Sequence, residues 1–340
     1  MSGGVDSSVA AALIQREGHE VVGATMKLWG GDSDSGCCSA ADVQDARRAA
    51  DQLGIDHHVF NFTEAFDDRV VAPYVADHAE GRTPNPCAEC NRYLKFGAFL
   101  ERACRLGFDA IATGHYAQVR RDDDGVRLAR AVDRAKDQSY VLSMLTAREL
   151  ERVALPVGGF EKSEIRRIAG ELGLVTAAKP DSQDVCFITS HMGGSGGRSS
   201  FLSARIPLHP GALVDSVSGA RIGTVDAVEL VTVGQRRGLA VASGERRFAL
   251  AVDVATRTVV VGDAAELLDD AVALTRRTWV GSPVGVGESC SAQVSAHGRS
   301  IPARFTTEGV AFDEPSRRVA RGQLVALYRD DEVIGSGVAC

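Results

Sequence analysis

The sequence has no long hydrophobic run. No stretch of about 18 consecutive apolar residues occurs, so a membrane-spanning helix is not predicted. No charged-then-apolar segment opens the chain, and a cytoplasmic protein is therefore expected. With 44% hydrophobic and 24% charged residues, the composition is typical of a soluble globular protein. The length of 340 residues predicts two or three domains.

An excess of positive charge is also missing. The net charge of −7 argues against wholesale coating of a nucleic acid, although a local basic face is compatible with it. The eight cysteines of a cytoplasmic protein are expected to be reduced, metal-bound or catalytic rather than joined in structural disulfides. Any function must therefore come from particular motifs and not from bulk composition.

The first motif is the loop at residues 2–8, Ser-Gly-Gly-Val-Asp-Ser-Ser, which runs into an alanine-rich apolar stretch. Gly3 and Gly4 let a ligand approach the backbone, and a following helix offers unpaired N–H groups to an anion. The Gly-Lys-Ser/Thr of a Walker loop is missing. An ordinary turn that caps a helix is the plainer alternative, but the Asp and both serines favour nucleotide binding. Such a loop normally follows a buried strand, so we expect that the first strand is missing at the N-terminus.

The rest of the chain changes character along its length. Strand-like and helical stretches alternate in the first half, which predicts an α/β fold with a parallel sheet and ligands at the carboxyl ends of its strands. After about residue 205, short β-rich runs alternate with Gly, Asp and Pro turns, which predicts two small β-rich domains. The expected domains are the α/β domain at residues 1–204, a small central β domain at 205–268 and a β-barrel-like domain at 269–340. The expected helices include 40–53 and 92–106.

Two stretches carry cysteines in polar surroundings. Residues 81–91 read Gly-Arg-Thr-Pro-Asn-Pro-Cys-Ala-Glu-Cys-Asn, where two prolines predict a shaped loop ahead of a helix that begins near Arg92. A thiol at a helix N-terminus has a lowered pKa. Cys186 lies in a second polar stretch, residues 179–188. Either cysteine alone could be a small buried residue. A glycine-rich run at residues 193–197 predicts a flexible loop.

Taken in order, these motifs resemble those of the bacterial tRNA-specific 2-thiouridylases, which belong to the PP-loop ATP pyrophosphatase superfamily. The motifs that carry the resemblance are residues 2–8, 26–27, 81–91, 113–117, 136–140 and 181–187. The resemblance implies an enzyme that uses ATP and Mg²⁺ to adenylate the oxygen on C2 of the wobble uridine, releasing pyrophosphate. Sulfur from a cysteine persulfide then replaces AMP. The implied partners are a tRNA with a wobble uridine and either a persulfide-carrying relay protein or a cysteine desulfurase.

The resemblance also implies roles for particular residues. Cys90 and Cys186 match the catalytic cysteines, and Asp6 matches a carboxylate near the metal. The residues that match the ATP-binding positions are Ser2, Gly3, Gly4, Val5, Asp6, Ser7, Ser8, Met26 and Gly114. The residues that match the tRNA-binding positions are Asn85, Pro86, Cys87, Lys136, Asp137 and Gln138.

One departure from the family opens an alternative. Many relatives carry Asp where this chain has Cys87, so Asp-assisted chemistry at that position is in doubt. Cys87, Cys90 and Cys186 would form a three-thiolate set suited to a [4Fe–4S] cluster, as an alternative to a persulfide and disulfide pair. No second cysteine pair completes a zinc knuckle. Two rival functions stay open, namely another PP-loop adenylating enzyme (an amide synthetase or ligase) and a non-catalytic nucleotide- and RNA-binding module.

Overall fold

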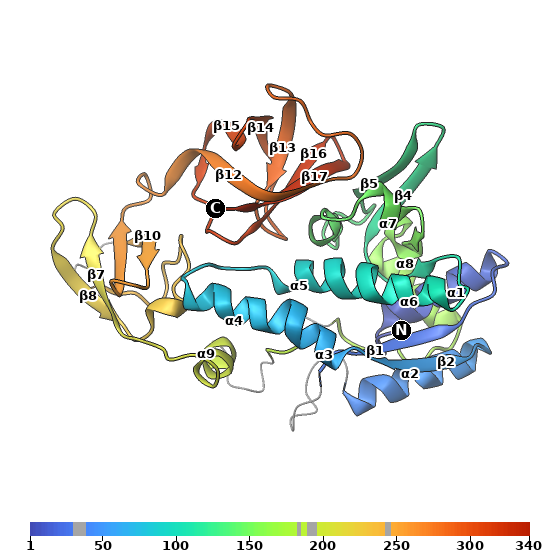
Figure 1. The fold of residues 1–340 in the computed structure, drawn as a ribbon. Helices are drawn as coiled ribbons and strands as arrows, with labels where there is room; N and C mark the ends of the chain where they lie inside the picture. The colour runs from blue at the N-terminus through green and yellow to red at the C-terminus, as the bar shows by residue number, and fades with distance from the viewer. Residues whose placement is uncertain (30–38, 182–184, 189–195, 242–245) are drawn as a thin grey trace.

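Three parts follow one another along the chain. A computed structural model describes all residues except 30–38, 182–184, 189–195 and 242–245. Figure 1 shows an N-terminal part of helices and short strands, a small β-sheet part beside it, and a C-terminal barrel that lies over the helices. The predicted order of one α/β part and two small β-rich parts is confirmed. Most of the predicted flexible glycine run lies outside the described residues.

The N-terminal part contains parallel strand pairs. β1 (Gly23–Lys27) pairs in parallel with β2 (His57–Asn61), and β3 (Ile111–Ala112) pairs in parallel with β6 (Val153–Ala154). Within the described residues these pairs form two separate sheets. The helices of this part are α1 (Val5–Arg16), α2 (Ala40–Leu53), α3 (Thr63–Phe66), η1 (Asp67–Val71), α4 (Ala72–Ala79), α5 (Pro86–Glu89), η2 (Cys90–Phe99), α6 (Leu100–Arg105), η3 (Ser139–Leu142), α7 (Ala147–Leu150), η4 (Pro156–Gly159), α8 (Lys162–Glu171) and α9 (Gly196–Ser203).

The predicted helix at residues 40–53 is confirmed, and its ends have local causes. Ser39 accepts a hydrogen bond from the Asp42 backbone N–H at 3.1 Å, which satisfies one of the free donors at the start of the helix. Gly54 adopts the left-handed conformation with φ 68°, which ends the helix. Ala46, Ala49 and Ala50 form its buried face.

The prediction of a helix that begins near Arg92 is wrong at its start. α5, η2 and α6 follow one another without a break, so the helical run begins at Pro86. Asn85 accepts a hydrogen bond from the Ala88 N–H at 3.1 Å, and proline suits the first position of a helix because it has no N–H to satisfy. Cys87 and Cys90 therefore lie inside the first turns of a helix and not in a loop before it.

The middle part is a five-stranded sheet with strand order β10-β11-β7-β8-β9. All pairings are antiparallel except that between β11 and β7, which is parallel. Leu213, Val259 and Val261 are fully buried in its core. The strands are β7 (Gly211–Asp215), β8 (Arg221–Val225), β9 (Ala240–Val241), β10 (Phe248–Asp253) and β11 (Thr258–Gly262), with a short helix η6 (Val228–Leu230) after β8.

The C-terminal part is a closed six-stranded barrel. Its strands follow the order β12-β15-β14-β13-β16-β17, and β17 pairs again with β12. Val325, Leu327 and Val310 fill its interior. The strands are β12 (Leu268–Trp279), β13 (Ser289–Gln293), β14 (Ile301–Phe305), β15 (Gly309–Arg317), β16 (Leu324–Arg329) and β17 (Glu332–Ala339).

A hairpin of the N-terminal part joins the barrel sheet. β4 (Ala117–Asp122) and β5 (Gly125–Arg130) pair with each other, and β5 pairs with β17 through Ala129 and Leu128. The barrel is thus hydrogen-bonded to the N-terminal part. Within the ranges that the structure describes, no helix combines the length and apolar character needed to cross a bilayer.

Candidate active site

The loop at residues 2–8 is compact and requires glycine. Gly3 has φ 71°, and a Cβ at this position would lie 2.3 Å from the Asp42 carbonyl oxygen. The Ser2 N–H donates to Ser7 Oγ at 3.0 Å, and Ser8 Oγ donates to the Gly4 carbonyl at 3.0 Å. Gly4 has no side chain to cap α1, so the first N–H groups of that helix are available to an anion.

Gly114 touches this loop directly. A Cβ on Gly114 would lie 2.6 Å from the Ser7 backbone nitrogen, so only glycine allows this approach. The neighbouring His115 is buried and lies within 3.5 Å of the Lys95 ammonium on η2. Burial and the positive charge of Lys95 hold the pKa of His115 well below its usual value, so its ring is neutral at pH 7. Gly114 and His115, which follow β3, therefore lie between the glycine loop and the helix that carries Cys90.

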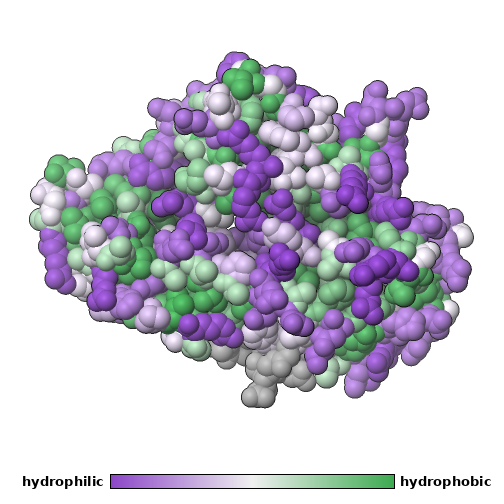
Figure 2. Space-filling model, viewed as in Figure 1, coloured by the Kyte–Doolittle hydropathy of each residue, from purple (hydrophilic) through white to green (hydrophobic). Residues whose placement is uncertain are grey.

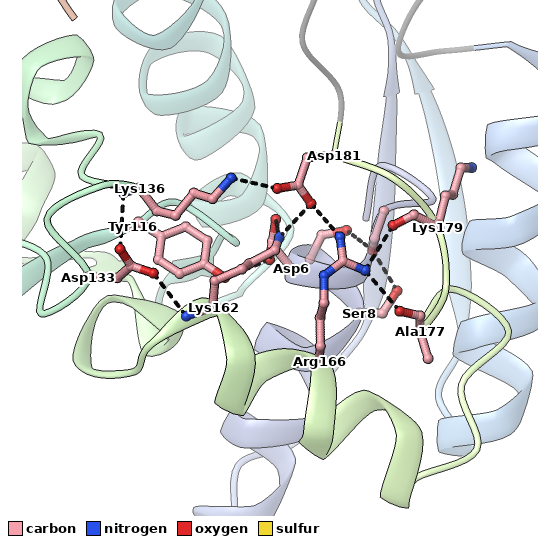
Figure 3. A network of polar contacts seen from close by, with 12 residues as sticks. Asp6, Ser8, Tyr116, Asp133, Lys136, Lys162, Arg166, Ala177, Lys179 and Asp181 are labelled. Carbon is pink, nitrogen blue, oxygen red and sulfur yellow. Dashed lines mark hydrogen bonds and ion pairs between the residues drawn. The ribbon is translucent and has the colours of Figure 1, made fainter. Parts of the chain in front are cut away.

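Asp6 is the centre of a polar network (Figure 3). The Tyr116 hydroxyl donates to Asp6 Oδ1 at 2.8 Å, and Lys162 Nζ contacts the two Asp6 oxygens at 2.6 and 2.9 Å. Burial and the nearby Asp6 charge raise the pKa of Tyr116, so its hydroxyl stays protonated and acts as a donor. Val5, next to Asp6, is buried against Tyr116 and the apolar side of α8, which fixes α1 beside α8.

Asp181 links this network to the segment that leads to Cys186. Its carboxylate accepts from Lys136 at 2.8 Å, from Lys162 at 2.9 Å and from Arg166 at 2.8 Å. Burial alone would raise the pKa of Asp181, but the hydrogen bonds from Lys136 and Lys162 outweigh it and lower the pKa to about 2. Asp181 is thus a permanent anion near neutral pH, held by three cations.

Cys90 and Cys186 meet in one hydrophobic cluster. Cys90 begins η2 and is 6% exposed, whereas Cys87, one turn earlier, is exposed. Cys186 and Met26 are half-buried and pack against the same cluster. Its buried members are Leu28, Phe62, Phe66, Val70, Val71, Tyr74, Cys90, Leu94, Phe187, Phe201 and Leu202. The structure therefore brings Cys90, Cys186 and Met26 together, and their catalytic and binding roles stay predictions.

In the described residues, the three cysteines are not arranged as ligands of one metal cluster. Within the described ranges, which include Cys87, Cys90 and Cys186, no three His, Cys, Asp or Glu side chains are placed so that they could hold a metal ion. Cys87 is exposed, whereas Cys90 is turned into the apolar cluster. The three-thiolate arrangement expected for a [4Fe–4S] cluster is not formed, and we derive no step through it.

The residues predicted to contact tRNA mostly bond to the protein itself. Asn85 caps α5, and Pro86 is buried. Asp137 accepts from Arg130 at 2.9 Å and from the Ser139 hydroxyl at 2.8 Å. Gln138 accepts from the Tyr116 N–H at 2.9 Å, and Lys136 belongs to the Asp181 network. These contacts hold residues 136–139 against the rest of the site. Direct contacts of these residues with tRNA stay a prediction.

Two cations of the site escaped the sequence analysis. Lys162 and Arg166 lie on one face of α8, and both reach Asp181. Lys162 is separated from Asp6 by 156 positions in the sequence, so no local spacing could have paired them. One feature of the sequence could have drawn attention to Lys162: it lies at the start of a predicted helix, where the helix dipole disfavours a cation.

The fold and this site define a class of protein. A glycine loop at a helix N-terminus beside parallel strands is the arrangement of a nucleotide-binding α/β domain. Residues 1–190 match the family model described as tRNA methyl transferase HUP domain. Residues 199–263 match the tRNA methyl transferase PRC-barrel domain, and residues 269–339 match the aminomethyltransferase beta-barrel domain.

Full-length relatives identify the family. The chain is 46% identical to the tRNA-specific 2-thiouridylase MnmA of Acidothermus cellulolyticus, over 99% of this chain and 95% of the relative. It is 46% identical to the protein of that name from Rhodococcus jostii, over the same shares of the two chains, and 41% identical to that of Roseiflexus sp., over 99% and 97%. The chain belongs to the tRNA-specific 2-thiouridylase family.

One solved structure is a distant neighbour. The U34-tRNA thiolase NcsA from Methanococcus maripaludis, with its [4Fe-4S] cluster, aligns with 60% of this chain and 68% of its own. The identity is 16% and the TM-score 0.35, so this likeness carries no argument about the site.

Proposed function

We propose that the protein is a tRNA-specific 2-thiouridylase. It uses ATP to adenylate the oxygen on C2 of the wobble uridine in tRNA, and sulfur then displaces AMP from C2. The observation that supports the proposal is a chain of contacts between the glycine loop and the cluster that contains Cys90 and Cys186. Asp181, on the segment that leads to Cys186, is tied through Lys162 to Asp6 of the glycine loop, and Cys186 shares one cluster with Cys90.

The first half-reaction belongs to the glycine loop. The backbone of residues 3–8 and the N-terminus of α1 bind the phosphates, while the C2 oxygen attacks the α-phosphorus and pyrophosphate leaves. Mg²⁺ that arrives with ATP needs one or two carboxylates besides the phosphates. Asp6, whose side chain is 30% exposed beside the loop, would supply the carboxylate that holds Mg²⁺, and the metal would neutralise the negative charge that develops on the leaving pyrophosphate.

The second half-reaction belongs to the cysteines. Cys186 receives a persulfide from a relay protein or a cysteine desulfurase, and its terminal sulfur attacks C2 as AMP leaves. Cys90, as a thiolate, then attacks the Cys186 sulfur, which releases the 2-thiouridine and leaves a Cys90–Cys186 disulfide for an external thiol to reduce. The target base must leave its stack to reach the site, which costs least in a loop such as the anticodon.

Both rival functions fit less well. Membership of the 2-thiouridylase family favours thiolation over an amide synthetase or ligase. A non-catalytic binding module would have no use for a buried Cys90 that shares its cluster with a second cysteine.

Mass spectrometry of tRNA nucleosides tests the proposal. Unmodified tRNA is incubated with ATP and a sulfur donor, and a 2-thiouridine nucleoside is expected at the wobble position. Cys90→Ser and Cys186→Ser should each lose thiolation by about 1000-fold or more, because each removes a covalent participant. Release of pyrophosphate on addition of tRNA should persist in Cys186→Ser, whose adenylation half-site is intact.

Cys104→Ser is the matched control. Cys104 lies on α6 in the same helical run as Cys90 but outside its cluster, and this variant should thiolate tRNA like the wild type. Wild-type protein that leaves the wobble uridine unmodified, under both aerobic and anaerobic conditions, would refute the proposed function.

A further inference from the structure

Lys162 is a buried cation with an unusual set of neighbours. Its side chain is 11% exposed, and its ammonium contacts both oxygens of Asp6 and one oxygen of Asp181. It is the first residue of α8, where the positive end of the helix dipole disfavours a cation. Lys162 at this position does not stabilise α8, and its ammonium contacts the loop through Asp6. We therefore look for a function of this lysine other than the stability of the helix.

Lys162 lies among carboxylates and other cations (Figure 3). Three cations, Lys136, Lys162 and Arg166, share two carboxylates, Asp6 and Asp181. The third carboxylate drawn there, Asp133, accepts from the backbone N–H groups of residues 136 and 162. The charges of these six side chains balance, and the Lys162 ammonium brings its charge to Asp6 at the N-terminus of α1.

We infer that Lys162 is a phosphate-binding residue of the ATP site, an inference that rests on the proposed function. A polyphosphate at the N-terminus of α1 would lie beside Asp6, and its Mg²⁺ would leave part of its negative charge uncompensated. The Lys162 ammonium on Asp6 supplies a further positive charge at that place. An ammonium donates equally well to carboxylate and phosphate oxygens, so the group that contacts Asp6 can also hold a phosphate at the same loop.

Asp181 is the positioning residue for this lysine. It contacts Lys162 on one oxygen and shares that oxygen with Arg166, while its other oxygen accepts from Lys136. Because three cations hold Asp181, this carboxylate keeps Lys162 in place when the contacts of Lys162 with Asp6 change. The Lys162 ammonium can then exchange an oxygen of Asp6 for one of phosphate without losing its second partner.

The alternative is that Lys162 only pairs with Asp6 to join α1 to α8. The two possibilities differ in what they predict for nucleotides of different length. A contact of Lys162 with the β- or γ-phosphate, which AMP lacks, strengthens the binding of ATP and not of AMP, whereas a purely structural pair affects the binding of both nucleotides equally or of neither.

Isothermal titration calorimetry without tRNA distinguishes them. ATP with Mg²⁺, and separately AMP, is titrated into wild-type protein, Lys162→Met and Lys162→Arg. We expect Lys162→Met to bind ATP at least about 10-fold more weakly while AMP changes less than about 3-fold, and Lys162→Arg to recover most of the loss. Arg167→Met, an exposed neighbour on α8 paired with Glu171, should bind both nucleotides like the wild type.

A double-mutant cycle with Asp6→Asn separates a contact of Lys162 with phosphate from its contact with Asp6. If Lys162 contacts phosphate, Lys162→Met still weakens ATP binding in that background. Lys162→Gln replaces Lys162→Met wherever circular dichroism shows that the latter does not fold.

Three results would overturn the inference: unchanged ATP affinity in Lys162→Met, equal losses for ATP and AMP, or a loss that disappears in Asp6→Asn. A different measurement, the formation of 2-thiouridine, tests the proposed function. Wild-type protein that binds ATP through Lys162 but never produces 2-thiouridine would refute the function and leave the phosphate role of Lys162 standing.

Discussion

At the scale of single residues, Asp181 is an ionisable group of the site that three cations hold. Its side chain is 20% exposed and accepts from Lys136, Lys162 and Arg166. Its pKa is lowered from 3.8 to about 2, since these hydrogen bonds overcome the opposing effect of burial. The folded protein therefore favours the ionised carboxylate more strongly than the unfolded chain does.

This pKa shift predicts a pH-dependent contribution to stability. A carboxyl with a lowered pKa in the folded state stabilises the protein fully above its unfolded pKa near 4, and the contribution is lost as the pH falls toward 2. Asp181→Asn should lower the free energy of unfolding by about 2 kcal/mol at pH 7, and the difference from wild type should narrow between pH 4 and pH 2. Urea unfolding at several pH values measures this.

Glu171→Gln is the matched control for that prediction. Glu171 pairs with Arg167 on the same helix, but both side chains are more than half exposed, so its loss should change the stability little at any pH. A pH-independent difference between Asp181→Asn and wild type would show that lost packing, not charge, causes the destabilisation.

Candidate site residues could be singled out only where a motif contained them. Ser2 to Ser8, Cys90 and Cys186 became candidates because each lies in a contiguous pattern, and their roles stay predictions. Lys162 could not, because its partner Asp6 is far away in sequence and an isolated lysine has no distinctive spacing. Lys136 could be singled out, but its placement at Asp181 depends on tertiary structure.

At the scale of elements, the segment at residues 81–85, which precedes α5, is held by the barrel. The Thr83 N–H donates to the Arg321 carbonyl at 2.7 Å, and Gln323 Nε2 donates to the Thr83 carbonyl at 2.7 Å. Gly322 has φ 89°, and a Cβ there would lie 3.2 Å from the Thr83 nitrogen. The turn at residues 320–323 thus fixes the entry to the helix that carries Cys87 and Cys90.

Removal of this clamp should slow thiolation without harming nucleotide binding. Gln323→Ala frees the Thr83 carbonyl and lets residues 83–87 shift, and a shift of about 1 Å at a reacting centre can cost about 100-fold in rate. We expect the rate of 2-thiouridine formation to fall by about 10-fold to 100-fold while ATP affinity stays within about 2-fold. Single-turnover thiolation and calorimetry measure the two quantities.

Arg321→Ala provides the control, because Arg321 contacts Thr83 only through its backbone carbonyl. This variant should thiolate like the wild type. If Gln323→Ala were equally active, the clamp would have no part in positioning the loop.

A helix was predictable where capping residues mark both of its ends in the sequence. The helix at 40–53 has Ser39 before it and Gly54 after it. The start of the helix at Pro86 was missed because two prolines suggested a loop, although Asn followed by Pro is also a helix start. The π-helical turn of η2 has no sequence signature of its own.

At the scale of the whole molecule, the β-rich and barrel-like character of the C-terminal part was predictable, whereas the strand partners that close the barrel were not. Alternating short strands indicate β structure, but pairing between β12 and β17 joins positions about 60 residues apart, and β5 pairs with β17 across about 200. No local pattern encodes such partners. The domain boundaries at residues 204 and 268 stay predictions.

Charge is the whole-molecule property that bears on tRNA. The net charge is −7, so the protein as a whole repels a polyanion, and binding must depend on a local basic surface. Figure 2 shows hydrophilic side chains spread over the visible face, with apolar residues in separate patches. A basic cluster lies beside Cys90, where Arg69 and Arg92 flank the Tyr93 ring and Arg276 donates to its hydroxyl at 3.2 Å.

This basic cluster joins the barrel to the helix that carries Cys90. Arg276 lies at a β-bulge of β12 in the left-handed conformation, φ 48°, and its guanidinium reaches Glu89 at 2.8 Å. Arg69 is exposed, and its described contact is with the face of Tyr93. A tRNA whose wobble base enters near Cys90 would bring its backbone phosphates past this cluster.

Arg69→Ala should therefore weaken tRNA binding in a salt-dependent way. Loss of one phosphate contact lowers the slope of log affinity against log salt by about one and weakens binding several-fold at low salt. Filter binding of unmodified tRNA between 50 and 200 mM salt measures this, with ATP affinity expected to stay unchanged. Arg48→Ala is the control, since Arg48 is equally exposed on α2, which Figure 1 draws away from β12. An Arg69→Ala slope that matches those of wild type and Arg48→Ala would exclude Arg69 from the tRNA interface and move the search for phosphate contacts to other basic residues around the site.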